Sequence, residues 1–68
     1  MPSSAIAAID YDSEHEQLTV TFVSGRAYRY FDVPPHIAAA FEWAPSKGTF
    51  FNTRIRDRYR FQEIVSTR

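Results

Sequence analysis

The chain has 68 residues, no cysteine and a formal net charge of zero. A chain of this length forms one small domain, in which folding buries only about 60% of the surface that the unfolded chain exposes. Disulfides and thiolate metal sites are excluded, and the neutral charge argues against a protein that coats nucleic acid through bulk charge. No apolar stretch approaches the roughly 20 residues of a membrane helix. We therefore predict a cytoplasmic, non-membrane domain over residues 1–68, with a core at about 4–60 and a tail at 61–68.

The first half of the chain repeats apolar residues at every second position, which is typical of strands with one buried face. This pattern predicts strands at residues 5–11, 17–23 and 26–33. Ser24 and Gly25 lie between the second and third strands and predict a hairpin turn.

The register of this hairpin decides where two tyrosines point, because a slip of one residue moves every side chain to the other face. A two-residue turn places Arg29 in the core and exposes Tyr28 and Tyr30. A turn that ends in a left-handed glycine bulge at Gly25 instead places both tyrosines on the apolar face of the second strand. We favour the bulge, because it requires positive φ only from a glycine and leaves Arg29 outside the core.

Helical spacing begins after residue 34. Pro35 suits a first helical turn, Pro45 ends the helix, and an apolar stripe runs between them at Ile37, Ala40, Phe41 and Ala44. Ser46 is the predicted N-cap of a second helix, in which Phe51 and Ile55 stack one turn apart.

The segment after Asp57 is ambiguous between helix and extended chain. A helix pairs Arg54 with Arg58, and like charges one turn apart repel, so we predict an extended tail. The predicted fold is α+β: a three-stranded antiparallel β-meander followed by two short α-helices packed on one face.

Several segments between residues 3 and 59 follow a familiar order and spacing. They are "SSAIAAIDYD" at 3–12, "LTVTF" at 18–22, Gly25, "YRYFDVP" at 28–34, "APSKGTFFN" at 44–52, Ile55, Arg56 and Tyr59. In this arrangement the sequence resembles the KTSC domain, a module named after the C-terminus of some lysyl-tRNA synthetases. The resemblance implies an RNA-binding role through that attachment, and it does not cover the tail at 61–68.

The second helix and the residues after it form the candidate binding site. Between residues 44 and 60, five basic residues stand against one acid, a local charge of +4. A helix N-terminus presents unpaired N–H groups that bind anions, and Gly48 indicates either a ligand close to the backbone or tight packing against a neighbouring element. The predicted phosphate or nucleic-acid contacts are Ser46, Lys47, Gly48, Asn52, Arg54, Arg56 and Arg58. The alternative is that Ser46 only caps the helix and the basic residues form a solvated face.

Three tyrosines form the aromatic motif. Tyr28 and Tyr30 are core residues in the favoured register, and a stacking platform for unpaired bases in the other. Tyr59 lies among arginines, as in single-strand binders, or docks the chain end onto the core.

Neither catalysis nor metal binding is indicated. The acidic stretch "DYDSEHE" lacks the glycine and final glutamate of a calcium loop, and His15 and His36 lie in different elements. Ser46 and Lys47 diverge on a helix and form no nucleophile and base pair. We expect no catalytic residue, no metal and no cofactor.

Three hypotheses for function remain. The first is a non-catalytic module that binds tRNA or another structured RNA. The second is a protein-interaction or self-association module, including a homodimer, with Trp43, Phe50 and Phe31 as anchors. The third is a bacterial or phage-borne accessory module without a ligand of its own.

Overall fold

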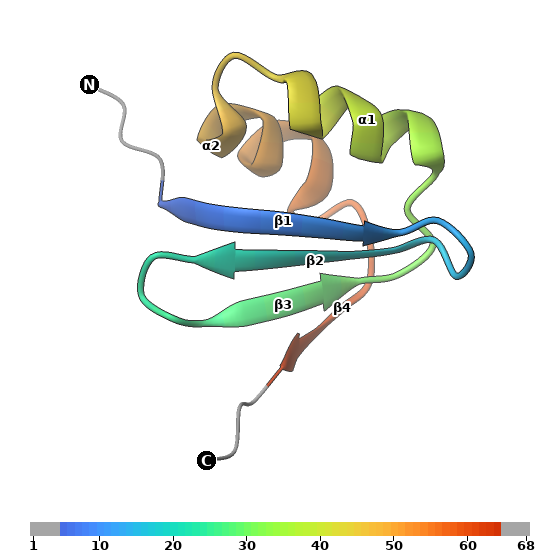
Figure 1. The fold of residues 1–68 in the computed structure, drawn as a ribbon, viewed down its shortest axis with the longest axis horizontal. Coiled ribbons are helices and arrows are strands. Elements are labelled where there is room, and N and C mark those ends of the chain that lie inside the picture. Colours follow the sequence, from blue (N-terminus) through green and yellow to red (C-terminus); the bar gives the residue numbers. More distant parts are fainter. Residues whose placement is uncertain (1–4, 65–68) are drawn as a thin grey trace.

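The computed structural model describes residues 5–64, which form an antiparallel sheet covered on one face by a helical layer (Figure 1). The strands lie in the order β1-β2-β3-β4. The predicted α+β class with two short helices is confirmed, and the sheet has one strand more than predicted. The bounds in chain order are β1 Ile6–Asp12, β2 Gln17–Phe22, β3 Ala27–Tyr30, α1 Pro35–Trp43, α2 Lys47–Phe50, the π-helical turn η1 Phe51–Ile55, and β4 Phe61–Ile64.

The β2–β3 hairpin turns at Gly25, whose φ is +98°. The Gly25 amide donates to the Phe22 carbonyl at 2.9 Å, and the Phe22 amide donates to the Arg26 carbonyl at 2.8 Å. A tight turn closed by a left-handed glycine gives this pair of bonds. The predicted glycine bulge is therefore confirmed.

The bulge sets the register of β2 against β3. Val20 pairs with Tyr28, and Leu18 pairs with Tyr30. Residues that pair across an antiparallel sheet share one face, so both tyrosines lie on the apolar side of β2. Arg29 points to the opposite face, which the helices do not cover. The predicted register is confirmed.

The chain after residue 60 is extended, as predicted, but it pairs with β3 as a fourth strand, so the prediction of a three-stranded sheet is wrong. Phe61 pairs with Tyr30, and Ile64 pairs with Ala27. The chain reverses at Asp57, which has a φ of +66°. Three of the four residues of β4 are exposed, so its sequence lacks the apolar pattern that marks a strand. The sheet therefore includes residues 61–64 of the predicted tail, and the rest of that tail, 65–68, lies outside the described residues.

α1 begins at Pro35, as predicted, and ends two residues before Pro45. Its buried side chains are Ala38 and Phe41. Ala40, which the predicted stripe includes, is exposed, because the face that meets the core is centred between Ala38 and Phe41. The position of the helix was therefore predicted correctly, and the face that it buries was predicted only in part.

Ser46 is the N-cap of α2, as predicted: its Oγ accepts a hydrogen bond from the Thr49 amide at 3.3 Å. The helix continues directly into η1, where Phe51 and Ile55 are buried. The Arg56 amide donates to the Phe51 carbonyl at 2.8 Å. This bond spans five residues, which makes the last turn a π-turn and directs the chain out of the helix at Arg56.

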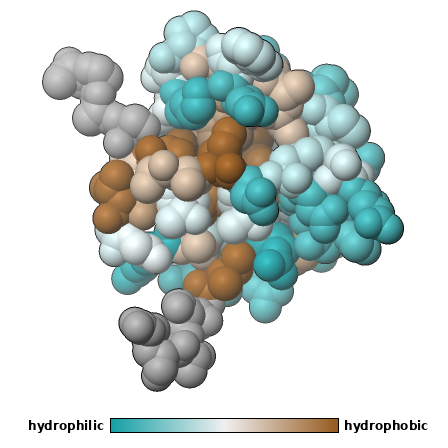
Figure 2. Space-filling view, viewed as in Figure 1, coloured by the Kyte–Doolittle hydropathy of each residue, from teal (hydrophilic) through white to brown (hydrophobic). Residues whose placement is uncertain are grey.

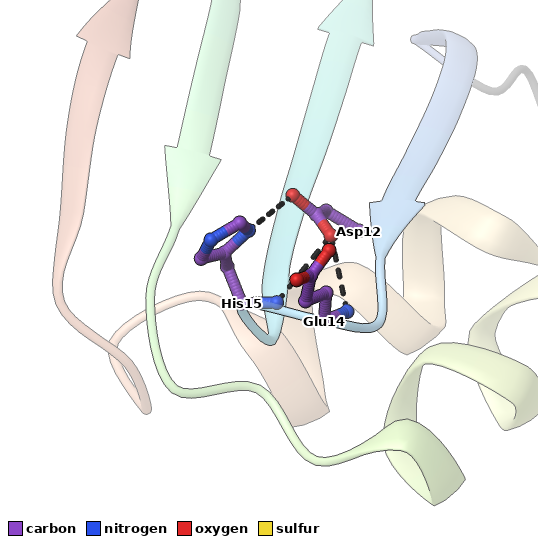
Figure 3. A group of neighbouring side chains, drawn as sticks. All are labelled: Asp12, Glu14 and His15. Atoms are coloured by element: carbon purple, nitrogen blue, oxygen red, sulfur yellow. Dashed lines mark hydrogen bonds and ion pairs between the residues drawn. The ribbon is translucent and has the colours of Figure 1, made fainter.

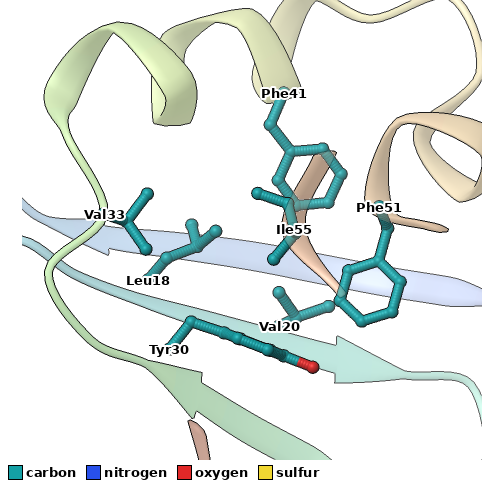
Figure 4. Packing of buried hydrophobic residues seen from close by; sticks show 7 residues of the cluster. All are labelled: Leu18, Val20, Tyr30, Val33, Phe41, Phe51 and Ile55. Atoms are coloured by element: carbon teal, nitrogen blue, oxygen red, sulfur yellow. The ribbon is translucent and has the colours of Figure 1, made fainter. Parts of the chain in front are cut away.

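The core lies between the sheet and the helical layer (Figure 4). The buried cluster consists of Leu18, Val20, Tyr30, Val33, Phe41, Phe51 and Ile55.

The Tyr11 hydroxyl on β1 donates a hydrogen bond to the Val33 carbonyl at 2.6 Å and so fixes the segment before α1. Neither helix in the described part of the chain, residues 5–64, has the length and apolar character that a membrane span requires.

Candidate functional site

A pocket of about 620 Å³ opens between the β2–β3 turn, the helical segment α2–η1 and β4. Its volume lies within the roughly 300–1,000 Å³ that is usual for small-molecule sites. On the face shown in Figure 2, hydrophobic residues gather on the side where Figure 1 places the β2–β3 turn. The pocket brings together residues of both predicted motifs, namely Tyr28, Tyr30, Gly48, Asn52 and Arg56.

Five aromatic rings line the pocket and contact one another in a closed sequence, which we call the aromatic circuit. Neighbouring ring centroids lie 5.4–5.8 Å apart, and four of the five contacts are edge-to-face. This geometry places the positive edge of one ring against the negative face of the next, so each ring is held in a defined orientation. In order around the circuit, the rings are Phe22, Tyr28, Phe61, Tyr30 and Phe51.

The Tyr30 hydroxyl faces the pocket. Tyr30 is only 4% exposed, and its hydroxyl has no hydrogen-bond partner among residues 5–64. Since no fully buried side-chain oxygen or nitrogen in this range lacks a partner, the hydroxyl must reach the solvent of the pocket. Figure 4 shows it on the Phe51 side of the core. Burial raises the pKa of Tyr30, Tyr28 and Asp57 add to the rise, and Arg56 opposes it. The hydroxyl is therefore protonated at neutral pH and able to donate.

Two arginines flank the pocket, one associated with each tyrosine. The Tyr28 side chain is the main cause that raises the pKa of Arg26, which follows the β2–β3 turn, and the charge of Glu63 adds to the rise. Arg56 follows η1, and its charge acts on the Tyr30 hydroxyl. Asp57 is the one acid among the described lining residues. Two arginines and one aspartate give the pocket a local charge of +1.

Gly48 and Asn52 lie one helical turn apart on the wall formed by α2 and η1. Apart from its chain neighbours and the backbone of its own helix, no atom of the described chain lies within 4 Å of the place where a Cβ on Gly48 would stand. This excludes tight packing against residues 5–64 as the reason for the glycine. The space in front of Gly48 belongs to the pocket, where the Asn52 amide adds a donor and an acceptor.

At the start of α2, where the sequence predicts a phosphate contact, the side chains of Ser46 and Lys47 bond to other groups of the protein. Ser46 caps the helix, and Lys47 Nζ donates to the Glu42 carbonyl at 2.9 Å and to the Ala44 carbonyl at 3.4 Å. Both carbonyls lie at the C-terminal end of α1. The lysine therefore has a structural role, and its contact with phosphate stays a prediction.

The other basic residues of the segment diverge. The Arg54 guanidinium lies 5.6 Å from the centroid of the Phe50 ring, and that of Arg60 lies 5.3 Å from the centroid of Phe31. Arg58 is exposed and does not line the pocket. The charge that is concentrated in the sequence is thus distributed over separate parts of the fold.

The predicted site residues did not include Arg26 or Phe61. One sequence feature could have indicated Arg26, namely its position directly after Gly25, the turn glycine of the β2–β3 hairpin. Phe61 joins the site only through the pairing of β4 with β3. Tyr59 is half-buried and packs against the core, which agrees with its predicted role in docking the chain end.

A second group of polar side chains lies at the β1–β2 turn (Figure 3). One oxygen of Asp12 accepts hydrogen bonds from the amides of Glu14 and His15 at 3.1 and 3.3 Å, and the other lies 2.8 Å from His15 Nδ1. The side-chain bond to His15 is the main cause that lowers the pKa of Asp12. The three groups lie within 4.8 Å of one another, and all are exposed. The hydrogen bonds of the turn account for this arrangement.

The fold and the pocket define a small α+β module with an aromatic site flanked by arginines. The family model of the KTSC domain matches residues 2–59, and the chain belongs to this family. A crystal structure of a KTSC domain protein from Yersinia pestis superposes with a TM-score of 0.86 at 33% sequence identity. The match covers 96% of this chain and 92% of that one.

Relatives occur both as a similar short protein and within a larger enzyme. A lysine–tRNA ligase from Nostoc punctiforme is 38% identical over 61 residues, which are 90% of this chain and 11% of the ligase. A protein from Stutzerimonas stutzeri is 38% identical over 65 residues and is covered over 92% of its length. The chain therefore corresponds to about a tenth of the ligase and to nearly all of the short relative.

Proposed function

We propose that this domain is a non-catalytic RNA-binding module whose contact surface is centred on the pocket. The observation that carries the proposal is the convergence of Tyr28 and Tyr30 with Arg26 and Arg56 at one pocket. Aromatic rings stack on unpaired bases, and guanidinium groups bind phosphate through paired hydrogen bonds. The similar segment in lysine–tRNA ligases supports tRNA or another structured RNA as the partner.

The centre of binding then lies at the pocket and not at the start of α2. Lys47 is engaged at the end of α1, whereas Arg56 leaves η1 beside the pocket. Arg26, on the adjoining hairpin, supplies the second cation. Arg56 from the basic segment and the tyrosines of β3 then contact the same ligand from two sides of one pocket.

A titration with total tRNA at two salt concentrations tests the proposal. Affinity is expected to fall as salt rises, because bound phosphates release counterions. Replacing Arg26 and Arg56 together with alanine is expected to reduce the slope of log affinity against log salt by about 1.4, or about 0.7 for each lost contact. Arg29→Ala is the matched control, since Arg29 is exposed on the opposite face of β3. Wild-type protein that shows no salt-sensitive binding contradicts the proposal.

The exposed Trp43 supports a second candidate function, protein interaction. Trp43 at the end of α1 is 83% exposed. The other two predicted anchors are half-buried, and each has an arginine over its ring, Arg54 on Phe50 and Arg60 on Phe31. Trp43 thus remains as the main anchor. Sedimentation at several protein concentrations, with Trp43→Ala as comparison, tests self-association, and a strictly monomeric wild type removes the homodimer.

A further inference from the structure

We infer that the pocket receives one unpaired nucleotide, with its base against Phe61 and Tyr28 and its phosphates near Arg26 and Arg56. The inference rests on the proposed RNA binding and specifies the form of RNA that binds: a single strand or an extruded base, in preference to an intact duplex. It is carried by the aromatic circuit, by the charge of the pocket and by the Tyr30 hydroxyl, which has no hydrogen-bond partner among residues 5–64.

The aromatic circuit presents an exposed ring whose orientation is fixed by its neighbours. Phe61 is 54% exposed, and its ring lies 5.8 Å from that of Tyr28 and 5.4 Å from that of Tyr30. Rings restrained by neighbours lose little freedom when a ligand stacks on them. Bases within a duplex are covered by their neighbours, whereas unpaired bases can leave the stack and lie on aromatic side chains. A concave aromatic pocket therefore suits an unpaired base.

The polar groups of the pocket suit the edge of a base. The Tyr30 hydroxyl is protonated, almost buried and without a partner in the described chain. An occupant that fills the pocket must supply an acceptor to it, since a buried polar group left unpaired is costly. The Asn52 amide offers a donor and an acceptor nearby. A planar ligand with hydrogen-bonding edges meets these requirements, and a purely aliphatic one does not.

The charge of the pocket selects the sign of the ligand. Aromatic pockets also bind cations, but among the described lining residues Arg26 and Arg56 outnumber Asp57. Glu63 acts on Arg26 from outside the lining, so the lining itself favours an anionic group. An anionic ligand with an aromatic body remains, which is the chemistry of a nucleotide. Gly48 leaves the backbone wall open for close approach.

Amide-shift titrations of the whole chain with three probes test the inference. The probes are a short single-stranded RNA, a blunt duplex that contains the same strand, and inorganic phosphate. The single strand is expected to shift the amides of Gly48, Asn52 and Arg56, and to bind about tenfold more tightly than the duplex. Phe61→Leu should weaken single-strand binding about tenfold, because base stacking on an aromatic ring is lost. The matched control is Trp43→Leu, which removes an exposed aromatic that does not line the pocket.

The outcomes separate this inference from the proposed function. Salt-sensitive binding of tRNA together with equal binding of single strand and duplex overturns the inference and leaves RNA binding intact. Absence of binding to every RNA overturns both. Pocket shifts caused by an aromatic peptide but by no RNA assign the site to a protein ligand and overturn the inference. The comparison of single strand with duplex uses the unaltered chain, so it decides the matter even where Phe61→Leu folds poorly.

Discussion

The Nζ atom of Lys47 lies 2.9 Å from the carbonyl oxygen of Glu42, so the first residue of α2 caps the C-terminal end of α1. A longer bond of 3.4 Å reaches the carbonyl of Ala44. The last carbonyls of a helix lack partners within it, and a cation is favoured at this end of the helix dipole. Lys47 thereby links the two helices across Pro45.

Replacing Lys47 with methionine is expected to destabilise the domain while RNA binding is largely kept. The substitution removes the bonds to α1 but keeps most of the apolar stem, so we expect the free energy of unfolding to fall by about 0.5–1.5 kcal/mol. Urea denaturation measures this loss. Arg58→Met serves as control, because Arg58 is exposed and its side chain makes no hydrogen bond, ion pair or ring contact within residues 5–64. Unchanged stability combined with lost RNA affinity would support the phosphate contact predicted from the sequence.

Replacing Tyr11 with phenylalanine is expected to lower stability without disturbing the pocket. The change removes the 2.6 Å hydrogen bond to the Val33 carbonyl and leaves that acceptor unpaired beside a buried side chain. We expect a loss of about 1–3 kcal/mol in the free energy of unfolding. Tyr59→Phe deletes the hydroxyl of another half-buried tyrosine that has no hydrogen bond among the described residues. An equal loss in both variants would contradict the role assigned to the Tyr11 bond.

The hairpin register was predictable from the sequence because its determinants are local. Gly25 tolerates positive φ, and the alternative turn places Arg29 in the core, so one turn decides the position of both tyrosines. β4 was not predictable in this way. The pairing of β4 depends on the chain reversal at Asp57 and on the free edge of β3. Neither feature can be recognised from the sequence of β4, because "FQEI" does not alternate apolar and polar residues.

The candidate site shows the same division between local and distant determinants. The sequence indicated that Gly48, Asn52 and Arg56 are close together, because the first two lie on one helical segment and Arg56 directly follows it. The sequence could not show that Lys47 turns towards α1, nor that Phe61 completes the aromatic circuit. Both depend on where separate elements meet in the folded chain.

Replacing Gly48 with alanine is expected to raise stability and to weaken RNA binding. The position is helical, and beyond its own helix a Cβ there would meet no atom of residues 5–64 within 4 Å. Alanine is favoured over glycine in a helix by about 1 kcal/mol, so the thermal midpoint should rise. The added methyl group enters the pocket and obstructs a ligand that approaches the backbone. Thr49→Ala, next to it on an exposed helical position, is the control for binding. Raised stability with unchanged RNA affinity would show that the ligand does not approach Gly48.

Alkaline pH is expected to destabilise the domain through Tyr30. Burial raises the pKa of Tyr30 in the folded chain above the value of about 10 that an unfolded tyrosine has. Below pH 10 both states keep the proton, so stability is unaffected. Above it the unfolded chain loses the proton first, and stability falls as pH rises towards the folded pKa. Tyr30→Phe removes this dependence and costs little at pH 7, because the hydroxyl has no partner among residues 5–64. Thermal midpoints at pH 7 and pH 11 should therefore fall further in the wild type than in the variant. Parallel falls in the two proteins would assign the alkaline loss to other groups, including Tyr11, whose pKa burial also raises.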